Sequence, residues 1–191
     1  MVYKPINKKQ LEEILVKLLI SRGKDADLND IDVSNIKEMH HLFYHVANIL
    51  PKNYIRNIDI SKWDISNVTD THGMFIRCSN FNCDLSNWNM SNVRNTSYMF
   101  SKCRNFNSDL SKWDVSNVTN MDSMFFFCSN FNSDLSKWKV NNVKNLDYAF
   151  TNCYKFNSNL SDWKFSGLIS TEYTFENCNS LLIKPTWYKE I

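Results

Sequence analysis

Histidine is the residue type in this chain with the most direct capacity for metal chemistry. All four histidines lie within the first 72 of the 191 residues. His41 and His45 are four residues apart, a spacing that places two imidazoles on one face of a helical turn. His40 and His72 occupy one position of the repeat described below, so they are expected to stack and are candidate metal ligands. The alternative is four solvent-facing histidines, which fits the lack of an acidic residue placed to orient a ring.

Cysteine could supply a nucleophile, a metal ligand or a disulfide. Five of the six cysteines recur every 25 residues, and a buried column of small apolar thiols is the interpretation that this regularity favours. A disulfide between neighbouring copies is the alternative, provided that the torsion angles fit. Cys83 lies outside the column and is predicted to be the accessible thiol. The column contains Cys78, Cys103, Cys128, Cys153 and Cys178.

Motifs for nucleophilic or nucleotide chemistry are absent from the sequence. Three glycines in the whole chain cannot supply a nucleophile elbow, a P-loop or a dinucleotide fingerprint. Asp64 and Asp114 lie close to Lys62 and Lys112, which predicts ion pairs between neighbouring strands rather than paired catalytic acids. A net charge of +2 gives no reason to expect a nucleic-acid partner. We therefore expect no cofactor.

A 25-residue repeat must position all of these side chains. Tryptophan recurs at this step from residue 63 to residue 163, and a fixed period of this size indicates one supersecondary unit stacked many times. Leu110, Trp113 and Val115 have the spacing of a short strand. Apolar residues at three- and four-residue spacing then predict a short helix or 3₁₀ segment over 118–128. The predicted fold is an α/β solenoid, a leucine-rich-repeat-like right-handed superhelix of six short parallel-strand rungs.

Both ends of the array are predicted to be capped. Asn7 and Gln10 have the spacing of a capping box, and Gly23 follows the apolar stripe, which predicts a helix over residues 7–21. The first rung is separated from the second by a seven-residue insertion, expected to bulge as a loop around residues 51–53. The predicted division is an N-terminal helical cap at 1–25, repeats at 26–178 and a C-terminal cap at 179–191.

Asparagine also recurs at one repeat position. Its amide can bond to backbone groups at a turn, so we predict a structural ladder rather than a catalytic row. Its members are Asn35, Asn67, Asn92, Asn117 and Asn142.

The predicted binding surface consists of the polar positions on either side of each tryptophan. They vary while the scaffold stays fixed, and their mixed charge, with a basic patch at Lys137 and Lys139, favours a protein or peptide partner. Phe126 and Phe127 replace polar residues of the other copies, which suggests a contact for self-association or for packing. The expected partner-binding residues are Lys62, Asp64, Asn87, Asn89, Lys112, Asp114, Lys137, Lys139, Asp162 and Lys164.

The repeat resembles a known bacterial family. The stretch from Trp113 through Ser-Asn-Val-Thr-Asn-Met to Phe125, Cys128 and Phe131 is similar to the repeat of BspA-type leucine-rich repeat surface proteins, which also occurs in mycoplasma lipoproteins. The resemblance covers about residues 26–178. It implies a leucine-rich-repeat-like fold, a role in adhesion or protein binding, and a location at the cell surface.

The function expected from the sequence is a non-enzymatic protein- or peptide-binding scaffold that uses the strand-lined face. One alternative is a secreted or surface adhesin that contacts host proteins. The other is a small metal-dependent enzyme built on the histidine cluster. The N-terminus lacks the apolar core of a secretory signal and no segment is long enough to span a membrane, so the chain as written is expected in the cytoplasm.

Overall fold

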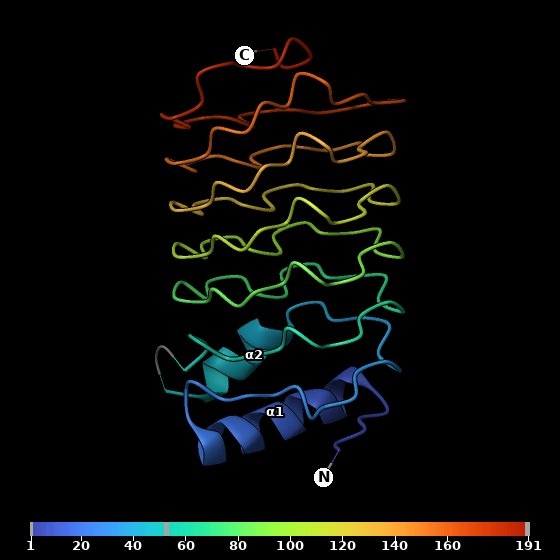
Figure 1. Cartoon of the computed structure of the whole chain (residues 1–191), viewed down its shortest axis with the longest axis vertical. Helices are drawn as coiled ribbons and strands as arrows, with labels where there is room; N and C mark the ends of the chain where they lie inside the picture. Colours follow the sequence, from blue (N-terminus) through green and yellow to red (C-terminus); the bar gives the residue numbers. More distant parts are fainter. Residues whose placement is uncertain (1, 52–53, 190–191) are drawn as a thin grey trace.

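The chain winds into a stack of coils, with the two termini at opposite ends (Figure 1). The computed structural model describes residues 2–51 and 54–189. Neighbouring coils run parallel and are joined by isolated β-bridges, one residue wide. Residues 52 and 53 of the predicted bulging loop, and residues 190 and 191 of the predicted C-terminal cap, lie outside the described residues. The longest series of bridges links Glu38, Asp70, Asn95, Asn120, Asn145 and Ser170.

Helix α1, Lys8–Arg22, lies across the first coil and confirms the predicted N-terminal helix (Figure 1). The Asn7 carbonyl oxygen of the side chain accepts a hydrogen bond from the Gln10 N–H at 2.9 Å, and Gln10 bonds back to the Ile6 N–H. Gly23, with φ of 84°, ends the helix. The leucines on the inner side of α1 are fully or almost fully buried, so the helix closes the N-terminal end of the core.

The predicted α/β solenoid with six parallel-strand rungs is wrong. The described residues contain two helices, α1 and α2 (Leu42–Ile49), and no β-strand. Helix α2 occurs in the first coil, where it packs against α1. The equivalent segments of later coils, including the predicted helical stretch 118–128, are successive turns.

Tight turns explain why the leucine–tryptophan–valine pattern does not form a strand. The Trp113 N–H bonds to the Leu110 carbonyl at 3.1 Å, and Val118 bonds in the same way to Val115. The Asp109 and Asp114 carboxylates each accept from the backbone N–H two residues later, which is an Asx turn. The chain is redirected every few residues, so no extended run is long enough to pair as a strand.

Left-handed residues shape the opposite segment of each coil. Gly73 and Arg77 have φ of 55° and 65°, and the equivalent residues of later coils are also left-handed. Alternate N–H groups of this segment bond to the next coil: Gly73 to Ser97 at 2.8 Å and Phe75 to Met99 at 2.9 Å. The hydrogen bonds between coils therefore form without the negative φ values that a strand requires.

The core consists of stacked columns of identical side chains. Phe100 and Phe125 lie with ring centroids 5.7 Å apart, and Trp113 and Trp138 lie 6.3 Å apart, nearly parallel in both cases. Each indole N–H also donates to a carbonyl in the preceding coil, as Trp113 does to Leu85 at 2.9 Å. The predicted burial of the tryptophan column is confirmed, since each member from 63 to 163 is at most 4% exposed.

Candidate functional site

The ten predicted partner-binding residues are all exposed. They lie in turns rather than on strands. The Asp64 carboxylate accepts from the Ser66 N–H at 3.0 Å, and Asn89 accepts from Ser91 at 3.1 Å. Lys139 and Lys164 occupy the same position in later coils and have no acceptor to form such a turn. The face therefore combines a fixed backbone with side chains that differ from coil to coil.

Ion pairs between neighbouring coils do not form on this face within residues 2–51 and 54–189. The described ion pairs all lie among the first 45 residues. The Asp114 carboxylate accepts hydrogen bonds from Ser116, which lowers the pKa of that carboxyl. The prediction of Lys–Asp pairs was wrong because the turn geometry holds each carboxylate against its own backbone.

The asparagine ladder is confirmed for four of its five members. Asn117 Nδ2 donates to the Ser91 carbonyl of the preceding coil at 2.7 Å, and Asn67, Asn92 and Asn142 make the same bond at 2.6–2.9 Å. These amides satisfy backbone carbonyls at a turn and are committed to structure.

The histidines form one cluster, but in a different arrangement from the predicted one. His41, rather than His40, lies against His72, with ring centroids 4.7 Å apart, and it also stacks on His45 at 5.8 Å. Glu12 of α1 binds His45 Nδ1 at 3.0 Å. The sequence analysis missed this carboxylate because it comes from a helix 33 residues away.

This cluster has the character of a packed joint between the helical cap and the coils. No group of three or more histidine, cysteine, aspartate or glutamate side chains in the described part of the chain is arranged to hold a metal ion. Burial, together with the neighbouring His72 and His45, lowers the pKa of His41. Its ring also fills the space beside Gly73, where a Cβ would lie 2.9 Å from it.

The cysteine column is buried, as predicted, and the six cysteines are free thiols. Cys128 Sγ donates to the Phe100 carbonyl of the preceding coil at 2.9 Å, and Cys103 bonds to Phe75 in the same way. Burial raises the pKa of Cys78 to about 12 and raises that of Cys128 well above its usual range. A thiolate nucleophile is therefore not available in the column.

The prediction that Cys83 is an accessible thiol was wrong, because its side chain is only 8% exposed. It belongs to a different column. The Ile60 N–H points to Cys83 Sγ at 3.5 Å, as the Leu85 N–H bonds to Ser108 Oγ at 2.9 Å in the next coil. Burial raises the pKa of Cys83 to about 11.

Phe126 and Phe127 are half-buried and contact each other edge to face, with centroids 4.6 Å apart. Phe126 also contacts Tyr148 of the next coil, and the Lys102 ammonium lies over its ring at 5.9 Å. Part of this aromatic pair is therefore packed within the chain and part remains accessible.

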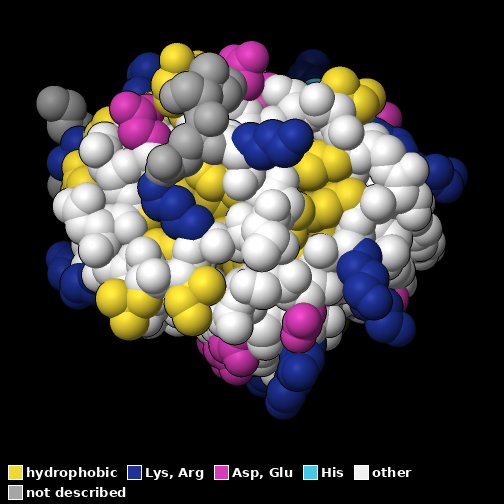
Figure 2. All heavy atoms as spheres, turned by 90° about the horizontal axis from the view of Figure 1, so that it is seen from above, with side chains coloured by type: hydrophobic (Ala, Val, Ile, Leu, Met, Phe, Trp, Pro, Cys, Tyr) yellow, Lys and Arg dark blue, Asp and Glu magenta, His cyan; other side chains and the backbone are white. Residues whose placement is uncertain are grey.

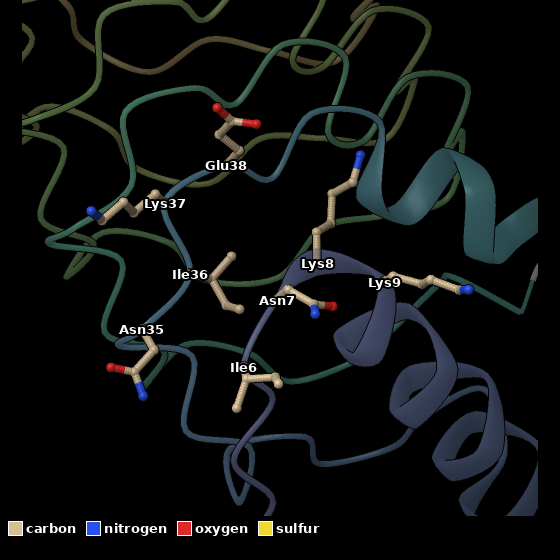
Figure 3. A pocket seen from close by; sticks show the side chains of 8 residues that line it. All are labelled: Ile6, Asn7, Lys8, Lys9, Asn35, Ile36, Lys37 and Glu38. Atoms are coloured by element: carbon tan, nitrogen blue, oxygen red, sulfur yellow. The ribbon is translucent and has the colours of Figure 1, made fainter.

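A hollow of about 560 Å³ lies where α1 begins. Figure 3 shows that Lys8 extends toward α2, whereas Lys37 and Lys9 point in other directions. Lys8 Nζ donates to the His40 carbonyl at 2.9 Å, so this ammonium holds α1 to the first coil. The charged groups do not converge on one point, and the hollow has no catalytic arrangement.

A second hollow, of about 430 Å³, lies between two adjacent coils and was missed by the sequence analysis. Its charged lining residues are Arg77, Lys102 and Arg104. The available signal was the 25-residue step from Arg77 to Lys102, two cations in a column that otherwise contains phenylalanine and asparagine.

The C-terminal end of the stack exposes apolar side chains, as Figure 2 shows from above. Ile169 and Leu182 are 82% and 83% exposed. Trp187 extends the tryptophan column, with its ring 5.9 Å from that of Trp163, although the two are only 24 residues apart. The end is thus covered in part by the tail of the chain.

Comparison with known proteins connects the repeat to one family. A family model described as "Mycoplasma protein of unknown function, DUF285" matches residues 16–117 and again residues 85–187. No curated protein and no solved structure matches the chain. The two matches overlap and together span nearly the whole sequence, which confirms the expected mycoplasma-type repeat. The chain therefore belongs to the DUF285 family of Mycoplasma proteins, whose function is unknown.

Proposed function

We propose that this chain is a non-enzymatic scaffold that binds a protein or peptide through the residues on either side of each buried tryptophan. The observation that carries the proposal is the contrast between invariant columns and variable exposed positions. Tryptophan, phenylalanine and cysteine repeat with one function each in packing or hydrogen bonding. The flanking pair changes from Lys62 and Asp64 to Lys137 and Lys139 on the same backbone.

The chemistry of this face suits a polypeptide of mixed charge. Lys112 and Asp114 present opposite charges on one coil, whereas Lys137 and Lys139 present a local basic patch on the next. Opposite charges placed at fixed spacing provide specificity through complementary potentials. Because Lys139 replaces a carboxylate that would bond to its own turn, its position adds charge to the face without adding turn stability.

The non-enzymatic part of the proposal follows from how the reactive groups are used. The thiols of the column are buried with raised pKa values, and the asparagine amides bond to backbone carbonyls. His41 is packed between the cap and the second coil. Each group that could do chemistry thus has a structural partner.

Charge reversal on the basic patch tests the proposal. A chain with Lys137→Glu and Lys139→Glu is compared with the wild type in affinity capture from cell extract, and each captured protein is then measured with purified components. Lys17→Glu and Lys24→Glu form the matched control, since both side chains are exposed on or just after α1 and carry the same charge. The proposal requires that the first pair abolish binding and that the control retain it. Equal binding by the two variants would place the site elsewhere.

The second candidate is a surface adhesin that contacts host proteins. It is supported by the membership in a Mycoplasma family and by the resemblance to BspA-type surface repeats. No helix in the described residues is long and apolar enough to cross a membrane. Protease treatment of intact cells tests location: an adhesin must be digested from outside, and full protection would exclude it.

A further inference from the structure

Three cationic side chains meet in the hollow between the coils that contain residues 77–80 and 102–105. Arg77, Lys102 and Arg104 line it together with polar side chains of Ser79, Asn80 and Asn105, and its volume is about 430 Å³. The three cationic residues are exposed, so a solute can reach them.

The repeat itself brings these cations together. Arg77 and Lys102 are one 25-residue step apart, and both adopt the left-handed conformation with φ of 65°. Equivalent rings of these two coils, Phe75 and Phe100, lie with centroids 5.4 Å apart, which gives the scale of the step. Arg104 follows two residues after Lys102, at a position where the preceding coil has a serine.

Nothing in the lining neutralises this charge. No carboxylate lines the hollow, and the described ion pairs lie elsewhere in the chain. Residues 71–108 contain four Lys or Arg side chains and one carboxylate, Asp84, although the whole chain carries a net charge of only +2. Like charges held this close repel each other unless an anion lies between them.

The surrounding groups also fix the cations in place. Arg77 N–H bonds to the Ser101 carbonyl at 2.8 Å, which holds its backbone against the next coil. The Lys102 ammonium lies over the Phe126 ring at 5.9 Å, one of the two aromatics that break the repeat pattern. Asn105 Nδ2 donates to Asn80 Oδ1 at 3.1 Å across the same two coils.

We propose that this hollow binds the tetrahedral oxyanion of a phosphate or sulfate ester. Two guanidinium groups can each donate two parallel N–H bonds to such an anion, and the lysine ammonium adds a compact charge. The site uses residues outside the partner-binding face, and the inference does not depend on the proposed scaffold function.

The chain provides its own neutral substitutes for the test. Arg77→Asn and Lys102→Asn copy Asn152 and Asn177, the left-handed residues of the same column, and Arg104→Ser copies the serine of the preceding coil. The triple variant should therefore fold, which its thermal unfolding midpoint checks. Lys17→Gln, Lys24→Gln and Lys155→Gln, at exposed positions, remove the same charge as a control.

Calorimetric titration with inorganic phosphate and sulfate, against chloride at equal ionic strength, measures the site. Binding to the wild type should weaken by about tenfold for each cation removed, since bonds to charged groups contribute most of the affinity. The control triple should bind as the wild type does. Failure of the wild type to bind either oxyanion, or an equal loss in both triples, would overturn the proposal.

Small esters then identify the source of the anion. Phosphoserine and a monosaccharide sulfate are each compared with the unesterified parent compound. Tighter binding of one ester than of its parent supports the site and names its ligand class. Equal binding of each ester and its parent would contradict it.

Discussion

Replacement of Trp113 by alanine tests whether the tryptophan column carries the stability of the stack. Trp113 is 3% exposed, stacks on Trp138 and donates its indole N–H to Leu85. Removing a buried aromatic side chain costs about 3–5 kcal/mol. The Leu85 carbonyl also accepts from the Trp88 N–H at 3.0 Å, so it keeps one donor after the change. Most of the loss must therefore come from the cavity rather than from an unsatisfied carbonyl.

Two further variants separate these contributions. Trp113→Phe keeps an aromatic ring but loses the indole bond, worth about 0.5–1.5 kcal/mol, and should destabilise by about 1–3 kcal/mol in all. Trp187→Ala removes a half-buried ring at the end of the column and should cost less than Trp113→Ala. Urea unfolding followed by the fluorescence of the remaining tryptophans measures all three. A loss below about 1 kcal/mol for Trp113→Ala would refute the packing argument.

Three other predictions follow from the site geometry. The six thiols should not react with an aromatic disulfide reagent until urea unfolds the chain; rapid reaction of any one in the native state would contradict their burial. The pKa of Asp114 is lowered in the folded state, so its contribution to stability should be lost as pH falls below about 4. Asp114→Asn should keep the turn, as Asn89 does, and flatten that acid dependence of the unfolding midpoint; an unchanged profile would refute the assignment. Phe126→Ser with Phe127→Asn, the residues of other coils, should abolish any self-association seen by sedimentation, and a persistent dimer would place the contact elsewhere.

The repeat identified the core because its columns are chemically uniform. Trp113, Phe125 and Cys128 recur at a fixed step, and burial of all three follows from that regularity. The helix at the N-terminus was also predictable, since Asn7 and Gln10 carry a local capping signal. These features depend on periodicity and on contacts between near neighbours in sequence.

The backbone path between the columns was not predicted. The pattern around Trp113 has strand-like spacing, but Asp109 and Asp114 turn the chain at both ends of that segment. The recurring aspartate–x–serine spacing was a usable signal for these turns. The left-handed conformation of Tyr98 and Lys102 had no such signal, because neither residue type favours it.

Long-range contacts limited the prediction of the candidate sites. Glu12 reaches His45 from α1, and Arg104 joins Arg77 across two coils. Both depend on how α1 and the coils are placed in space. The exposure of Lys137 and Lys139, by contrast, followed directly from their position beside a buried tryptophan.

The central claim about the molecule is that each coil of 25 residues closes through turns and left-handed residues rather than through strands. Backbone chemical shifts and three-bond couplings measured by NMR test it most directly. They should show positive φ at Tyr98, Tyr148 and Tyr173, recurring in step with the repeat, between residues of negative φ. A continuous run of extended residues through 96–102 and its equivalents would contradict the claim and restore a strand-lined face.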